Sequence, residues 1–161
     1  MALARVKFGK LFRCGSESGN AAIEFGLFIP VLLILLTGTV ELGFLMYEAM
    51  QVNNAVEAGA LYAAANGFNA ASITSAVTNA SVLPAGLNAL TATPAPTQFC
   101  GCPTAAGVTN LGNPPCSATA CSGSPAGTYV QVNASLTHTI IIPNPWVPTT
   151  PLTATAVIRI N

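Results

Sequence analysis

Four cysteines in the second half of the chain are the residues best suited to chemistry. Cys100, Cys102, Cys116 and Cys121 lie in a stretch from Thr93 to Thr128 that is rich in Pro, Gly, Ser, Thr and Ala. A loop of this length is either functional or cross-linked. Two disulfides are predicted, and because a Cys100–Cys102 bridge would be strained, crossing and nested pairings both remain open. The alternative is a four-cysteine zinc site, although a C-x-C pair followed by a C-x4-C pair departs from the usual C-x2-C spacing.

Acid–base chemistry has little support in the sequence. His138 is the one histidine of the chain and falls on the apolar face of a predicted strand, which indicates a packed core residue. The chain has no Asp, and every Glu lies at or before Glu57, so no carboxylate is expected near His138 in the second half of the chain. The Cys-x-Cys pair has no adjacent cation to lower a thiol pKa. We therefore expect no catalytic residue, no metal site, no cofactor and no small-molecule substrate.

Charge is scarce and unevenly placed. Charged residues make up 6% of the 161 residues, against about 25% in a typical soluble domain, and 52% are hydrophobic. Four of the five bases precede residue 14, and Arg159 is the only charged residue after Glu57. This pattern excludes the basic surface of a nucleic-acid-binding protein. It fits a chain that crosses a membrane near its N-terminus.

A charge-free apolar run extends from Phe25 to Val40. As a helix it covers roughly 24 Å of a hydrocarbon core about 30 Å thick, so we extend the predicted span back to Ala21. The bases before it place the N-terminus in the cytoplasm, and the remainder is exported. An oxidising compartment favours disulfides over metal at the four cysteines. A cleavable secretory signal is disfavoured because no convincing A-x-A site follows the run.

The residues around the start of this run carry a family resemblance. Ser18-Gly19-Asn20-Ala21-Ala22-Ile23-Glu24-Phe25 resembles the leader junction of the type IV pilin superfamily, where a basic leader ends in Gly. Residues 19–43 and 54–63 are similar to the TadE-like family of the tight-adherence (Flp, type IVb) pilus system, whose members are minor pilins or pseudopilins. The later segments YVQVNASL and LTATAVIRI resemble the family more loosely. Many relatives carry a base in place of Leu61.

The resemblance implies that a membrane-embedded prepilin peptidase cuts between Gly19 and Asn20, which makes Glu24 the fifth mature residue and Phe25 the sixth. Gly is sterically open at a scissile bond. After cleavage Glu24 could pair with the amino group of Asn20, or with that of a neighbouring subunit, and so offset the cost of a carboxylate in an apolar turn. The alternative is that Glu24 reaches the headgroups of an ordinary signal anchor. Processing would leave one base and four acids, a net charge of −3.

A predicted assembly surface follows from the same segment. Pro30 is expected to kink the membrane helix, and Gly38, Gly43 and Gly59 offer close-approach sites for another helix. Together with Glu24 these residues form the surface expected to pack among other stems. The expected partners are the peptidase, other pilins or pseudopilins, and the tight-adherence assembly machinery.

The predicted fold is α+β and similar to pilin-type heads. We expect a basic leader at 1–19, a transmembrane helix at 20–45, an exported helical stem at 46–66, and an exported head at 67–161 with a cysteine-rich loop at 94–128. The buried stem face is predicted from the spacing of Val52, Val56, Gly59 and Ala63, and Asn66-Gly67 is a C-cap signal. A second short helix is expected at 69–80, with Ile73 and Val77 as its apolar pair.

A small antiparallel sheet of about three strands completes the predicted head. Period-two alternation predicts strands at 130–142 and 152–160, and a weaker first strand at 87–93. Residues 143–148 contain three prolines and must form a loop.

Two functions from different classes remain open. The first is a processed minor pilin or pseudopilin that supports pilus assembly and surface adhesion, in the bacterial inner membrane with a periplasmic head or in the extracellular pilus. The second is an unprocessed, single-pass, membrane-anchored binding module that never enters a filament. N-terminal processing discriminates between them.

Overall fold

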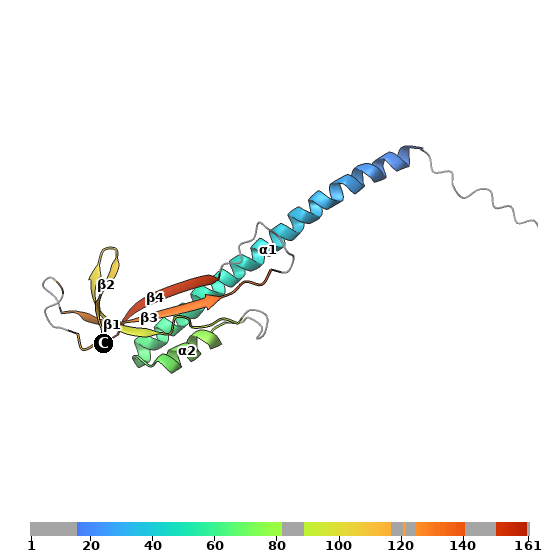
Figure 1. Ribbon diagram of the computed structural model, residues 1–161. Coiled ribbons are helices and arrows are strands. Elements are labelled where there is room, and N and C mark those ends of the chain that lie inside the picture. The colour runs from blue at the N-terminus through green and yellow to red at the C-terminus, as the bar shows by residue number, and fades with distance from the viewer. Residues whose placement is uncertain (1–15, 82–88, 117–120, 122–124, 141–150, 161) are drawn as a thin grey trace, which may run out of the picture. The chain divides into compact units, whose positions relative to one another are not determined.

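The computed structural model describes residues 16–81, 89–116, 121, 125–140 and 151–160, and only the backbone of residues 16–18. Most of the predicted leader and the loop predicted at 143–148 lie outside the described residues. The predicted α+β class is confirmed, because the described residues form two helices and an antiparallel sheet (Figure 1). The chain divides into two compact units, Met1–Val40 and Glu41–Asn161.

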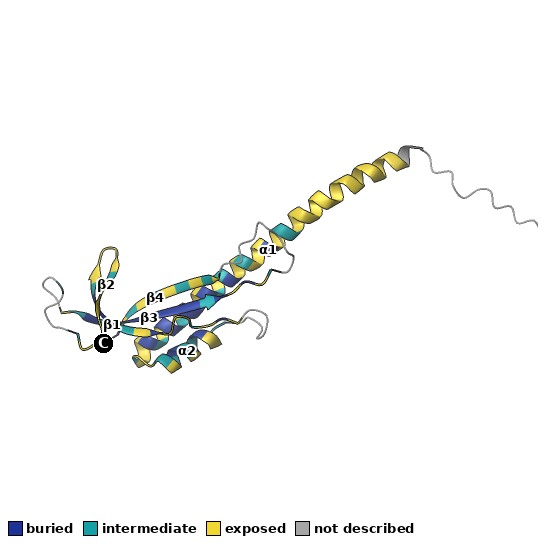
Figure 2. Ribbon diagram, in the orientation of Figure 1, coloured by how far each residue is buried: buried dark blue, intermediate teal, exposed yellow. Residues whose placement is uncertain are grey.

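Helix α1, Ser16–Asn66, contributes to both units. It contains a segment that is long and apolar enough to cross a membrane, with a mean hydropathy of 2.2 and no buried residues (Figure 2). Pro30 lies inside this helix. The hydroxyls of Thr37 and Thr39 donate hydrogen bonds to the carbonyls of Leu33 (2.9 Å) and Leu35 (2.7 Å). These polar groups are therefore satisfied without water, as a bilayer requires.

One face of the second half of α1 forms part of the hydrophobic core. Val52, Val56, Gly59 and Ala63 are all buried, which confirms the predicted face. The helix ends where Asn66-Gly67 predicts. Gly67 has a φ of 78°, and its N–H donates to the carbonyl of Ala63 at 2.9 Å. A left-handed residue after the last turn is the usual reason for Gly at this position.

Helix α2, Ala70–Asn79, is the predicted second helix. Its first turn is capped by Asn69, whose side-chain oxygen accepts a hydrogen bond from the N–H of Ser72 at 3.0 Å. Ile73 and Val77, the predicted apolar pair, are fully buried. The helix thus joins the core through one narrow apolar stripe.

The sheet has four antiparallel strands in the order β2-β1-β3-β4. They are β1, Thr97–Thr104, β2, Gly107–Gly112, β3, Gly127–Leu136, and β4, Leu152–Ile160. The predicted alternation holds on β4, where Thr153, Thr155, Val157 and Arg159 are exposed and the residues between them are at least partly buried. Strand β3 is more buried and lies between β1 and β4 (Figure 2).

The core of the second unit joins three groups of side chains. They are Val52, Ala55, Val56, Ala60 and Ala63 of α1, Ile73 and Val77 of α2, and Val130, Val132, Ala134 and Leu136 of β3. Leu90 and Ile160 complete it.

The cysteine-rich segment departs from the prediction, because it contains strands β1 and β2 and is not only a loop. This raises the strand number from about three to four. The cysteine-rich segment is rich in Gly, Pro and Thr, which are typical of loops. Strand β2 is almost entirely exposed, so its sequence shows no alternation of apolar and polar residues. A turn joins β1 to β2, with Gly107 at a φ of 132° and the Thr104 hydroxyl donating to the Gly107 carbonyl at 2.9 Å.

Two other strand predictions were too long. Strand β3 ends at Leu136 instead of continuing to residue 142, because Leu152, the first residue of β4, pairs with Leu136. Among the described residues, 137–140 belong to no strand, and residues 141 and 142 lie outside the described residues. The expected strand at 87–93 is reduced to an isolated bridge between Thr91 and Ser135, with N–H to carbonyl distances of 2.9 and 2.8 Å, and residues 87 and 88 lie outside the described residues.

Candidate functional site

The predicted processing junction lies in the first turns of α1. The bond between Gly19 and Asn20 falls one turn after the helix begins at Ser16. A Cβ built at Gly19 would meet no atom within 4 Å. The Asn20 side-chain amide donates a hydrogen bond to Glu24 Oε1 at 3.3 Å, and both residues are exposed. The two residues that the pairing hypothesis joins are thus one helical turn apart and on the same side of the helix.

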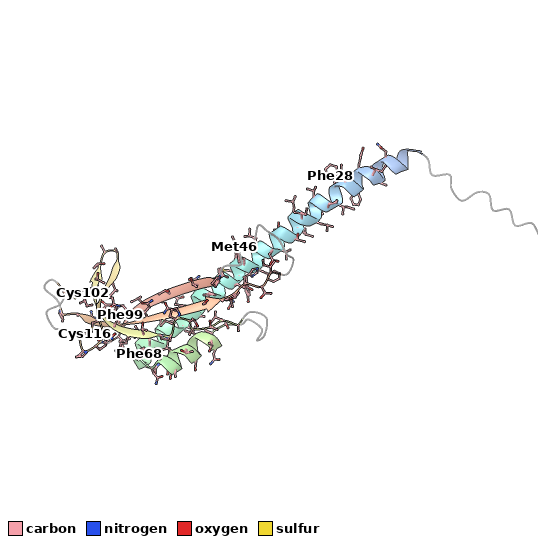
Figure 3. The ribbon with its side chains drawn as sticks, viewed as in Figure 1. Phe28, Met46, Phe68, Phe99, Cys102 and Cys116 are labelled. Carbon is pink, nitrogen blue, oxygen red and sulfur yellow. A yellow bond between two sulfur atoms is a disulfide. The ribbon has the colours of Figure 1, made fainter. Side chains whose placement is uncertain are left out.

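The helix beyond this junction presents apolar side chains on every side. Leu27 is 76% exposed and Phe28 68% exposed (Figure 3). A helix that is hydrophobic all round needs an apolar solvent or partner helices on all sides. Gly38 and Gly43, two of the predicted packing sites, are open, because a Cβ built at either would meet nothing within 4 Å.

Gly59, a third predicted packing site, is used inside the chain. A Cβ built there would lie 2.5 Å from Val77 Cγ2 and 3.0 Å from Val132 Cγ1. The missing side chain lets α1 approach both α2 and β3. This separates Gly59 from Gly38 and Gly43, which remain candidates for contact with another helix.

The comparison with protein families identifies this same segment. Residues 19–61 match the family described as TadE-like protein. The chain carries a TadE-like segment. The resemblance predicted from the sequence is therefore confirmed over these residues. No curated protein and no solved structure matches the chain.

The TadE-like segment crosses from one compact unit to the other. It begins at Gly19, the residue before the predicted cut, and ends at Leu61 in the packed half of α1. Leu61 is exposed. The matched residues thus include the whole apolar run and most of the helical face on which the sheet and α2 pack.

The four cysteines form two disulfides, Cys100–Cys116 and Cys102–Cys121, with Cα–Cα distances of 5.3 and 5.5 Å. The pairing is the crossing one, since each bridge begins on β1 and the two sequence spans interleave. Cys102 and Cys116 are labelled in Figure 3. Phe99 of β1 stacks on Tyr129 of β3, with ring centroids 5.8 Å apart. The bridges therefore tie the exposed hairpin end of the sheet to the segment that leads into β3.

The second unit also contains a cluster of three ionisable side chains that was not expected. His138 Nδ1 lies 2.7 Å from Glu48 Oε2, and His138 Nε2 lies 3.0 Å from Glu41 Oε1. Each of the three residues is only 4% exposed. The prediction that His138 is buried is correct. The prediction that no carboxylate lies near it is wrong, because the compact unit begins at Glu41 and includes both glutamates.

A signal for this cluster was present in the sequence. The buried stripe Val52, Ala55 and Gly59, followed back along the helix at spacings of three and four, reaches positions 48, 45 and 41. Glu41 and Glu48 are seven residues apart, which places them on one face two turns from each other. Acids at apolar positions of a stripe indicate a buried polar partner.

The electrostatics of His138 follow from its two neighbours. Burial by itself lowers the pKa of His138, because it disfavours the charged imidazole. The hydrogen bonds and opposite charges of Glu48 and Glu41 act the other way and prevail, so the pKa lies above the ordinary value of 6.5. Both ring nitrogens are occupied by carboxylates, which leaves neither available to take a proton from a bound substrate.

Proposed function

We propose that the chain is a TadE-like minor pilin or pseudopilin, a structural or assembly component of a tight-adherence (Flp) pilus that supports pilus formation and surface adhesion. The observation that carries the proposal is the family match at residues 19–61, which begins at the predicted end of the leader and covers the fully exposed apolar helix. A helix of this kind is suited first to a bilayer and then to a bundle of similar helices.

The proposal assigns a place to each part. The apolar part of α1 anchors the chain in the bacterial inner membrane with its N-terminus in the cytoplasm and its head in the periplasm. We place the membrane exit close to Val40, earlier than residue 45, because Glu41 belongs to the packed head and contacts His138. Prepilin peptidase cuts after Gly19. The partners are other pilins or pseudopilins and the assembly machinery, in the membrane or in the extracellular pilus.

Glu24 has a specific role in this proposal. It is an exposed carboxylate within the apolar helix, and in hydrocarbon such a group costs about 2.5 to 3.5 kcal/mol at mid-bilayer. Removal of the leader creates an amino group at Asn20, one turn away. The resulting ion pair, within the chain or with a neighbouring subunit, offsets that cost and favours insertion of the processed helix into a bundle.

The test uses a matched pair of substitutions in the full chain, expressed in cells that contain the peptidase. Removal of the leader lowers the mass of the chain by roughly 2 kDa. Gly19→Val places a branched side chain at the scissile bond and is expected to prevent this loss. Gly26→Val makes the same change at a position that is equally open in the structure, and cleavage is expected to proceed. Intact-mass spectrometry of the membrane fraction reads both outcomes.

The alternative, an unprocessed membrane-anchored binding module, predicts a different result. The wild-type chain would then keep Met1 in cells with and without the peptidase. An intact leader in the wild-type chain would overturn the processing part of the proposal and favour the alternative.

A further inference from the structure

The segment that follows β3 is held on α1 by a buried side-chain cluster. His138 comes two residues after β3 ends at Leu136, and its ring lies between Glu41 and Glu48 of α1. The ladder between β3 and β4 has already ended at Leu136. The side-chain hydrogen bonds of His138 to Glu41 and Glu48 therefore connect this part of the chain to the helix.

The hydrogen bonds fix how many protons the cluster holds. When both glutamates are carboxylates they can only accept hydrogen bonds, so both ring nitrogens must donate, and only an imidazolium has two N–H groups. The same two bonds form if the second proton lies on a carboxyl oxygen. In either arrangement the three groups share two protons and carry a net charge of −1. Loss of one proton leaves a nitrogen lone pair facing an oxygen lone pair at about hydrogen-bond distance.

We propose that Glu41, Glu48 and His138 form a proton-dependent clasp, which holds the segment after β3 on α1 at acidic and neutral pH and weakens as the pH becomes alkaline. Burial makes the cluster sensitive to the loss of a proton, because water cannot replace a lost hydrogen bond at residues that are only 4% exposed. Loss of one charge from a buried ion cluster leaves another charge uncompensated. This destabilises the fold more than replacing the whole cluster by apolar residues would.

The sign of the effect follows from the geometry and from the direction of the His138 pKa. A group whose pKa is raised by folding stabilises the fold fully below its unfolded value, about 6.5, and that contribution is lost as the pH rises through the higher folded value. Among the described residues, the charged groups that act on the ring are the carboxylates of Glu48 and Glu41. Glu57 of the same helix and Arg159 of β4 are exposed.

The chain offers a direct spectroscopic test because His138 is its one histidine. The full chain, labelled with ¹⁵N-histidine and reconstituted in lipid nanodiscs, gives one pair of imidazole signals that can be followed from pH 5 to pH 9. The proposal predicts that the imidazole signals at pH 6.5 are still those of the two-proton cluster, and that they change with a titration midpoint above that pH. A wild-type titration midpoint at or below pH 6.5 would overturn the proposal, and this measurement needs no variant.

A charge-neutral variant tests the role of the two carboxylates. In Glu41→Gln/Glu48→Gln the shape is kept and the opposite charges are removed, so burial should shift the His138 midpoint below the wild-type value. Glu57→Gln removes an exposed acid from the same helix and should leave the midpoint unchanged. An equal midpoint in all three proteins would overturn the assignment.

Thermal unfolding of the same three proteins reads the consequence for stability. The melting temperature of the wild type and of Glu57→Gln should fall between pH 7 and pH 9, whereas the double variant should lose this dependence. Parallel pH profiles for the wild type and the double variant would contradict the clasp. The result is independent of the proposed pilus role, since it concerns the fold of the exported unit and not leader removal.

Discussion

One helix, α1, serves two different environments. From Gly19 to Leu36 its residues are exposed on every side, whereas from Glu41 one face is buried against the sheet and α2. The surroundings of the carboxylates differ in the same way. Glu24 is exposed among apolar residues, whereas Glu41 and Glu48 are buried and hydrogen-bonded to His138. Sequence hydrophobicity alone therefore does not identify the core of this protein. The most apolar residues lie outside it, and many core residues of α1 are alanine or valine.

The sharpest test of this comparison makes the same substitution in both regions. Leu136→Ala removes a fully buried side chain of β3 and should lower the free energy of unfolding of the second unit by about 2 to 5 kcal/mol. Leu33→Ala changes a half-exposed residue of the apolar run and should alter that free energy by less than about 0.5 kcal/mol. Urea unfolding in detergent measures both. Equal losses would mean that the apolar run is part of the folded head.

A somewhat smaller effect is expected for the disulfides. Cys102→Ser/Cys121→Ser opens a loop closed across a sequence separation of 19 and should cost the second unit about 3 kcal/mol. Cys14→Ser, in the segment that processing is expected to remove, is the control and should leave stability unchanged. The comparison is made by thermal unfolding under non-reducing conditions. A loss of stability on Cys14→Ser, or none in the double variant, would contradict the division of roles.

Glycine substitutions give the smallest difference. Gly59→Ala places a methyl group against Val77 and Val132 and should destabilise the head by about 1 to 3 kcal/mol, less the gain in helix propensity of about 1 kcal/mol. Gly38→Ala meets nothing within 4 Å and should not destabilise the head. If Gly38 serves helix packing between subunits, Gly38→Ala should reduce recovery of the chain with pili. Denaturation midpoints and pilus yields separate the two effects.

The parts of the fold that local pattern determines were predicted from the sequence. The stem face, the C-cap at Asn66-Gly67, the pair Ile73 and Val77, and β4 follow from periodicity of three to four or of two, and from Gly geometry. These features depend on neighbours in the sequence, so a single chain is enough to reveal them.

The features that were missed depend on distant partners. Strand β2 has no buried alternation, and its pairing is fixed by β1. The crossing disulfides require the register of β1, which spacing alone leaves open. The cluster of His138 with Glu41 and Glu48 joins residues 90 and more positions apart. The two carboxylates come from the helix and not from the strand region that contains His138, so neither periodicity nor spacing along the chain reveals the contact.

We propose that a TadE-like helix with its leader removed carries this head into a pilus assembly. Mass spectrometry of sheared pili and of the inner-membrane fraction from the same cells tests it most directly. We expect a chain that begins at Asn20, with both disulfides intact, in the pilus fraction, the membrane fraction or both. A chain that begins at Met1 and occurs only in the membrane would contradict it.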